Sequence, residues 1–206
     1  VLVLKPLHDS FEIKRVVTST YQSVSGGGKN HMMELEEQTK SVLEHKKVKS
    51  KNFTKQIAFN VIPHIDVFSD DGYTKEELKM RNETKKILGL PSLQVSCTCV
   101  RVPVYRAHSI SINAEFDSPV NVPDARTALE NFNGVELWDL PNALRYPMPI
   151  NYSEKELCGV GRLRLDHGFP NGLALWTVGD QLWKGAALNA VQIAEELINR
   201  KCLKNL

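Results

Sequence analysis

The chain has 206 residues, which is enough for one large domain or two small ones. Apolar residues make up 42% and charged residues 24%, which is ordinary for a globular protein and too apolar for a disordered one. The 26 basic and 24 acidic side chains leave a net charge of +2, which excludes nucleic acid or an anionic membrane as the main partner. No apolar run approaches the ~20 residues of a membrane helix, so we expect a soluble chain.

Four cysteines stand at positions 97, 99, 158 and 202, too few and too scattered for a disulfide-stapled secreted module. The chain has no second C-x-C and no His pair, so we expect no metal site. A reducing cytoplasm is the expected location. Cys97 and Cys99 would share one face of a strand, either as small buried hydrophobes or with one of them as a nucleophile.

The first half of the chain alternates strand and helix patterns. Residues 15–21 are short and β-branched, which predicts a strand that the glycines at 26–28 break. Helix formers predict a helix over 30–45, and the lysines crowded into 40–55 are typical of a solvated helix end and loop. An apolar run predicts a second strand over 57–65.

A capping-box signature at Thr74 and Glu77 predicts a helix from there to residue 88, where Gly89 ends it. Residues 93–104 have a strand pattern up to Pro103. The segment then alternates strictly, with Ile110, Ile112, Ala114 and Phe116 predicted on a buried face and Ser109, Ser111, Asn113 and Glu115 on a wet one.

The second half predicts a helix over 123–132, strands over 159–165 and 172–178, and a last helix over 181–200. With five or six strands and four helices, and without repeats or low-complexity linkers, the chain is predicted to be one α+β domain. Its helices would form one layer on one face of a mixed, largely antiparallel sheet.

Three local patterns have more than one interpretation. The Gly26–Gly28 loop, between a strand and a helix, could bind a carboxylate or phosphate or be a plain turn, and it matches neither a Walker loop nor G-x-G-x-x-G. Arg101 and His108 flank the end of one strand and could form an anion clamp and a proton carrier, or a surface pair. Glu76 and Lys79 share a helix face, which is also common on surfaces.

Four blocks in the same order resemble the aspartate-semialdehyde dehydrogenases. The blocks are VTSTYQSVSGGGK at 17–29, AFNVIPHID at 58–66 with the helix that follows, CVRVPVYRAH at 99–108, and GDQLWKGAALNAVQIAE at 179–195. Together they cover nearly the whole chain, and their shared order makes the resemblance specific.

The resemblance implies an enzyme that reduces aspartyl-β-phosphate to aspartate β-semialdehyde with NADPH, releasing phosphate, in lysine, methionine and threonine biosynthesis. It implies that residues 1–206 are the catalytic and dimerisation domain, with a fold like the glyceraldehyde-phosphate-dehydrogenase C-terminal domain. The nucleophilic cysteine and an N-terminal Rossmann domain are expected before Val1, so this chain alone would be inactive. The helix at 181–200 would pack on that NADP-binding domain, and the protein would be a homodimer or homotetramer.

The resemblance also assigns roles to individual positions. Gln22 and His108 would be catalytic, with Gln22 also contacting substrate beside the thiol and His108 as the acid/base group. Arg101 would bind the substrate α-carboxylate, a task for which its planar fork is suited. The remaining positions would contact the amine (Glu76), the phosphate (Lys79) and NADP near the nicotinamide (Ser25, Gly26, Gly27 and Gln181). Cys97 and Cys99 would then be structural.

Two other functions remain open at this point. N-acetyl-glutamyl-phosphate reductases share the two-domain plan and thioester chemistry, but an acylated amine has no need of Glu76 as a partner for a cation. The chain could instead be a dimerisation and substrate-binding module without turnover of its own. Binding of nucleic acid through the lysines at 46–51 would require a basic stripe that this near-neutral composition lacks.

Overall fold

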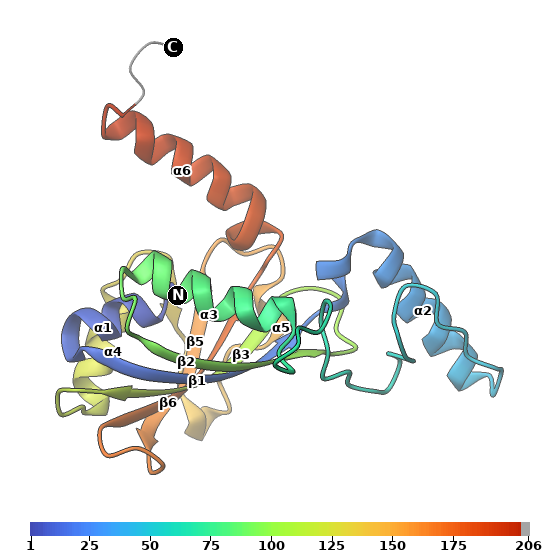
Figure 1. Ribbon diagram of the computed structural model, residues 1–206, viewed down its shortest axis with the longest axis horizontal. Helices are drawn as coiled ribbons and strands as arrows, with labels where there is room; N and C mark the ends of the chain where they lie inside the picture. The colour runs from blue at the N-terminus through green and yellow to red at the C-terminus, as the bar shows by residue number, and fades with distance from the viewer. Residues whose placement is uncertain (203–206) are drawn as a thin grey trace.

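A computed structural model describes residues 1–202, which form a six-stranded sheet with helices packed on it (Figure 1). The strand order is β2-β1-β3-β6-β5-β4. Pairs β1–β3, β3–β6 and β5–β6 are antiparallel, whereas β1–β2 and β4–β5 are parallel. The strands are β1 (Ile13–Gln22), β2 (Gln94–Arg101), β3 (His108–Phe116), β4 (Val135–Leu137), β5 (Cys158–Asp166) and β6 (Gly172–Gly179).

The helices are α1 (Leu4–Phe11), α2 (Lys29–Leu43), α3 (Lys75–Leu88), α4 (Val122–Glu130), α5 (Pro149–Tyr152) and α6 (Leu188–Asn199). The capping box at Thr74 and Glu77 is present at the start of α3, as predicted. Short 3₁₀ helices cover Val24–Gly27 and Pro141–Ala143, and a π-helix covers Trp183–Ala187. None of the helices in residues 1–202 is long and apolar enough to cross a membrane.

The main core lies between one face of the sheet and helices α1 and α4. The predicted alternation of β3 is confirmed on its apolar side, because Ile112, Ala114 and Phe116 are buried there with Leu7 and Leu129. Helix α3 packs on β2 on the same side. The fold is therefore the predicted α+β domain, with a mixed sheet and its main helices on one face.

The predicted strand over 57–65 is wrong. Ile57 and Ala58 are buried, but against α2, and their main-chain N–H groups donate to Oε1 of Gln38 at 2.8 and 3.3 Å rather than to a neighbouring strand. Only Ile62 forms a β-bridge, with Arg101. An apolar β-branched run has the same composition whether it covers a helix or joins a sheet, so its pattern could not separate the two cases.

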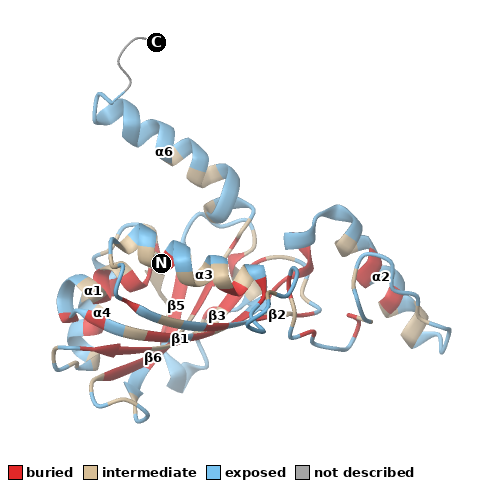
Figure 2. Cartoon of the chain, viewed as in Figure 1, coloured by how far each residue is buried: buried red, intermediate tan, exposed pale blue. Residues whose placement is uncertain are grey.

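Other differences are smaller. Helix α1 and strand β4 were not predicted, and the polar side of β3 is less wet than expected because Ser109 and Glu115 are buried. Two elements extend beyond the sheet in Figure 1: α2 with its following loop at one end, and α6, whose surface is almost entirely exposed (Figure 2). The lysine-rich stretch is the end of α2 and an exposed loop, as predicted.

Gly159 has no room for a side chain. A Cβ at this position would lie 2.2 Å from Cζ of Tyr152, whose ring is fully buried. We expect Gly159→Ala to lower the free energy of unfolding by about 1–3 kcal/mol, because overpacking forces the ring or strand β5 to move. Denaturant unfolding would measure the change, with Gly185→Ala as control, where the nearest atom to a new Cβ is 3.5 Å away. Equal stability of the two variants would contradict this packing.

Candidate active site

Four ends of strands meet at one end of the sheet and bring the predicted site residues together. Strands β1 and β2 run parallel and finish in register, with Gln22 opposite Arg101. Strand β3 runs the other way and therefore begins at the same end with His108, which pairs with Gly179 at the end of β6. The topology thus converts three distant sequence blocks into one cluster.

A group of polar side chains links Gln22 to helix α3. The side-chain amide of Gln22 donates to Oε1 of Glu76 at 3.3 Å, and Oε2 of Glu76 lies 3.5 Å from Nζ of Lys79. Lys79 is largely exposed, so this ion pair adds little to stability. Its geometry places a carboxylate and an ammonium group beside Gln22, at the mouth of the cluster.

Hydrogen bonds fix both the main chain and the side chain of Arg101. Its main chain exchanges two hydrogen bonds with Ile62, and its Nη1 donates to the carbonyl oxygen of Ser23 at 2.7 Å. Burial lowers the pKa of Arg101, whereas the nearby Glu76 raises it. A Cβ at Gly26 would lie 2.9 Å from Nη1 and 3.3 Å from the His108 ring, so a side chain at this position would push against both groups.

His108 is fixed by the residue that follows β1. The main-chain N–H of Ser23 donates to Nδ1 of His108 at 3.1 Å, and the Ser23 hydroxyl lies 3.0 Å from the same nitrogen. Burial and the positive charge of Arg101 lower the pKa of His108 to about 4, although the Ala107 carbonyl and Asp180 oppose the shift. The imidazole is therefore neutral at neutral pH.

This lowered pKa predicts a dependence of stability on pH. His108 is protonated near pH 6.5 in the unfolded chain and only near pH 4 in the folded chain. The free energy of unfolding is therefore unaffected by His108 above about pH 6.5, and it decreases as the pH falls from there towards 4. The expected slope over this window is at most about 1.4 kcal/mol per pH unit. Urea unfolding at several pH values between 7 and 4 should show that the free energy of unfolding depends less on pH in His108→Gln than in the wild type. Identical pH dependences for the wild type and His108→Gln would contradict a partly buried histidine held in its neutral form.

The residues predicted to contact a nicotinamide cofactor also meet. Nε2 of Gln181 donates to the Ser25 hydroxyl, whereas its Oε1 is buried and has no hydrogen-bond partner within residues 1–202. A carboxamide N–H₂ group is the donor that this oxygen lacks, so the site fits a nicotinamide. Gln181 and His108 line the same pocket of about 360 Å³.

Glycine is also required at the next loop position. A Cβ at Gly27 would lie 2.5–2.6 Å from atoms of the His31 ring. Consecutive glycines, with Gly28 at φ 87°, therefore let the chain turn from β1 into α2 while staying close to the site. The predicted turn is present, and it packs against the side chains of the site.

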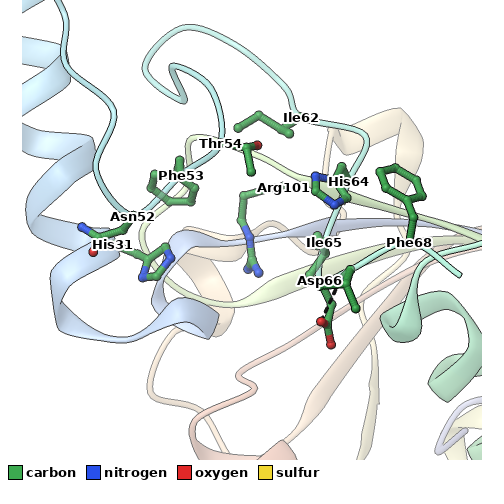
Figure 3. Close-up of a pocket in the computed structure, with 11 residues that line it drawn as sticks. His31, Asn52, Phe53, Thr54, Ile62, His64, Ile65, Asp66, Phe68 and Arg101 are labelled. Atoms are coloured by element: carbon green, nitrogen blue, oxygen red, sulfur yellow. Dashed lines mark hydrogen bonds between the residues drawn. The ribbon is translucent and has the colours of Figure 1, made fainter.

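The guanidinium of Arg101 also borders a second pocket, of about 480 Å³, between α2 and the loop that follows it. In Figure 3, His31 and Phe53 lie on one side of Arg101, and His64 and Asp66 on the other. The AFNVIPHID block therefore contributes to the site as a pocket wall, although it forms no strand. Within residues 1–202, no group of three or more His, Cys, Asp or Glu side chains could hold a metal ion.

A family model described as "Semialdehyde dehydrogenase, dimerisation domain" matches residues 4–184. The chain belongs to this family. The aspartate-semialdehyde dehydrogenase of Aquifex aeolicus is 50% identical over 199 residues, which cover 96% of this chain and 58% of the relative. That of Bacillus subtilis is 45% identical over 205 residues, covering 96% of this chain and 59% of the relative.

Solved structures of semialdehyde dehydrogenases have the same fold. Aspartate semialdehyde dehydrogenase II of Vibrio cholerae, in a structure described as complexed with ASA, superposes with a TM-score of 0.92 at 43% identity. The match covers 96% of this chain and 58% of that one. A probable aspartate-semialdehyde dehydrogenase from Pseudomonas aeruginosa gives 0.89 at 29% identity, covering 95% and 58%. The chain thus spans about three fifths of the length of these relatives.

This semialdehyde dehydrogenase domain has an ion pair beside the site, between Arg106 and Asp180, that was not predicted from the sequence. The fully buried Asp180 accepts from Nε of Arg106 at 2.7 Å, and from the main-chain N–H groups of Glu154 at 2.7 Å and Leu182 at 2.9 Å. Ala107, between Arg106 and His108, has a φ of 68°, a conformation that alanine rarely adopts. The pair ties the loop before His108 to the residue before Gln181. The sequence offered one sign of this pair: Arg106 and Asp180 each lie in one of the blocks that resemble the family.

The burial and the hydrogen bonds of the two cysteines of β2 fit a structural role. Both are buried, the thiol of Cys97 donates to the carbonyl oxygen of Glu77, and the N–H of Cys99 donates to the Glu77 carboxylate at 2.9 Å. A hydrogen bond between the two thiols raises the pKa of Cys99, together with burial, and lowers that of Cys97. The shift at Cys99 is opposite to what a nucleophile requires, and the Cys97 thiol is buried and already donates to the Glu77 carbonyl oxygen. This agrees with the structural role that the resemblance implies.

Proposed function

We propose that this chain is the substrate-binding and dimerisation part of an NADP-dependent aspartate-semialdehyde dehydrogenase. The whole protein would reduce L-aspartyl-4-phosphate to L-aspartate 4-semialdehyde, with release of phosphate, in lysine, methionine and threonine biosynthesis. The observation that carries the proposal is the meeting of Gln22, Glu76, Arg101 and His108 at one end of the sheet. The names of the Aquifex and Vibrio relatives support the same activity.

The charges of the cluster suit the amino-acid end of such a substrate. Arg101 uses one N–H group on Ser23 and retains others for a bidentate pair with the α-carboxylate. Glu76 would bind the α-ammonium group, and Lys79, one helical turn away, would bind the phosphate. These three residues would orient the substrate, while Gln22 and His108 would contact its reacting carbonyl.

The cofactor would be bound next to His108. Ser25, Gly26, Gly27 and Gln181 would contact the nicotinamide end of NADP, with the free Oε1 of Gln181 accepting from the carboxamide. When bound, NADPH supplies a hydride. The nucleotide-binding domain and the nucleophilic cysteine would come from the part of the relatives that this chain does not span. Helix α6 would pack on that domain, which is supported by its exposed apolar side chains, among them Val191, Ile193 and Ile198.

A coupled assay tests the proposal directly. The whole protein should form NADPH from L-aspartate 4-semialdehyde, NADP and phosphate, and NADPH formation should stop when phosphate is omitted. The 206-residue chain alone should form none, since it would lack the nucleophile and the nucleotide-binding domain. Absence of turnover by the whole protein, or phosphate-independent turnover, would contradict the proposed reaction.

N-acetyl-glutamyl-phosphate reduction is the second candidate, because it shares the thioester chemistry. It is less favoured since Glu76, which Gln22 contacts directly, would face an uncharged acetylated amine. The third reading, a binding module without turnover, describes the expected behaviour of these 206 residues by themselves.

We propose a homodimer, formed through the sheet face that carries none of the main helices. On this face of the inner strand β1, Val17 and Tyr21 are 39% and 38% exposed, and Tyr21 packs on Trp176 of β6. Exposed apolar side chains in the middle of a sheet are typical of an interaction surface. The family description as a dimerisation domain supports the same state.

Replacing Val17 by aspartate should therefore convert the dimer to monomer, because a face-to-face contact would bury two unpaired carboxylates. Light scattering coupled to gel filtration should give half the wild-type mass. The control Leu43→Asp changes an exposed residue at the end of α2 and should leave the mass unchanged. A wild-type monomer, or loss of the dimer only in the control, would contradict this interface; a fourfold mass would indicate the homotetramer.

A further inference from the structure

The hydrogen bonds at Nδ1 of His108 restrict which ring nitrogen can hold the proton. A main-chain N–H group can only donate, and that of Ser23 points at Nδ1 from 3.1 Å. A proton on Nδ1 would place two donors against each other in a buried position, where Ser23 is fully covered. Nδ1 therefore presents its lone pair, and the neutral ring carries its proton on Nε2.

A chain of side-chain hydrogen bonds ends at the same nitrogen. Nε2 of Gln181 donates to the Ser25 hydroxyl, which lies 3.0 Å from the Ser23 hydroxyl, which in turn lies 3.0 Å from Nδ1 of His108. Each hydroxyl can accept one hydrogen bond and donate the next, so the series runs from the amide to the imidazole. Ser23 and Ser25 are both buried, so bulk solvent does not reach their hydroxyls.

The charged groups around His108 also favour the neutral ring. Arg101 lies beside it, and the carboxylate of Asp180, which could have stabilised an imidazolium, is already paired with Arg106. Lys184 lines the same pocket as another positive group, together with the thiol of Cys158. At neutral pH the ring is therefore uncharged, in agreement with its lowered pKa.

We infer that Ser23 is a positioning residue that fixes His108 as the neutral Nε2–H tautomer, so that His108 offers a hydrogen-bond donor to a carbonyl oxygen bound in the site. Both contacts that join the ring to Ser23 fall on Nδ1, and the side chain lines the pocket that Gln181 borders. The carbonyl ligand rests on the proposed function, whereas the tautomer does not. The inference narrows the acid/base role: the donor stabilises developing negative charge on oxygen without release of its proton.

The tautomer can be measured in the 206-residue chain itself. Long-range ¹H–¹⁵N correlation spectra of the labelled chain at pH 7, with the His108 signals assigned from His108→Gln, should show an unprotonated Nδ1 and a protonated Nε2. The same pattern should persist in Ser23→Ala, because the main-chain donor remains. An Nδ1–H tautomer or an imidazolium in the wild type, or a mixture of tautomers in Ser23→Ala, would overturn the inference.

A kinetic comparison in the whole protein tests the role. His108→Ala removes the donor and should lower kcat by ~10²–10³-fold. Glutamine keeps an uncharged N–H donor, so His108→Gln should be roughly tenfold or more faster than His108→Ala if donation is what matters. Equal kcat values for the two variants would overturn the donor role. A wild-type protein without turnover would refute the proposed function, while the tautomer would still be decided by the spectra.

Discussion

Replacing Arg101 by leucine in the whole protein is expected to raise KM for L-aspartate 4-semialdehyde by on the order of 10²–10⁴-fold. The estimate follows from losing two charge-assisted hydrogen bonds to the α-carboxylate, each contributing roughly 1.5–3 kcal/mol. The side chain is partly buried and its guanidinium is fixed by the hydrogen bond to the Ser23 carbonyl oxygen, which suits it to this task. Steady-state kinetics with varied semialdehyde would measure the change.

Two controls separate this effect from a general loss of structure. Arg101→Lys keeps the charge but loses the planar fork, so its KM should lie between those of the wild type and Arg101→Leu. Arg200→Leu changes an exposed arginine at the end of α6 and should leave KM unaltered. If Arg101→Leu lowered kcat while KM stayed constant, Arg101 would not anchor the carboxylate.

Replacing His108 by alanine should have the opposite signature. We expect kcat to fall by ~10²–10³-fold with little change in KM, because the donor contacts the carbonyl oxygen chiefly as negative charge develops there. Single-turnover measurements would show that chemistry, and not product release, has slowed. Similar, small effects of His108→Ala and Arg101→Leu on kcat/KM would contradict the division of roles between these two residues.

The sheet was largely predictable, because local patterns control most of its elements. The alternation in β3 and the capping box before α3 are local signals, and both predicted elements are present. The segment 57–65 shows the limit of such signals. Its burial depends on Gln38, a residue about twenty positions earlier, whose amide oxygen takes the N–H groups that a neighbouring strand would have used.

The candidate site was predicted from resemblance and from residue chemistry, and the fold explains why its members meet. Parallel pairing of β1 and β2 brings Gln22 and Arg101 into register, a long-range fact that no local pattern contains. The tautomer of His108 depends in the same way on where the main chain of Ser23 ends up. Sequence could nominate the reacting side chains, whereas their main-chain partners required the structure.

The central claim is that this site recognises an amino-acid aldehyde with a free α-ammonium group. The measurement that tests it most directly is the ratio of kcat/KM, in the whole protein, for L-aspartate 4-semialdehyde and for N-acetyl-L-glutamate 5-semialdehyde. With Glu76 beside Gln22, we predict that the free-amine substrate is preferred by on the order of 10²-fold or more. A preference for the acetylated substrate would contradict the account.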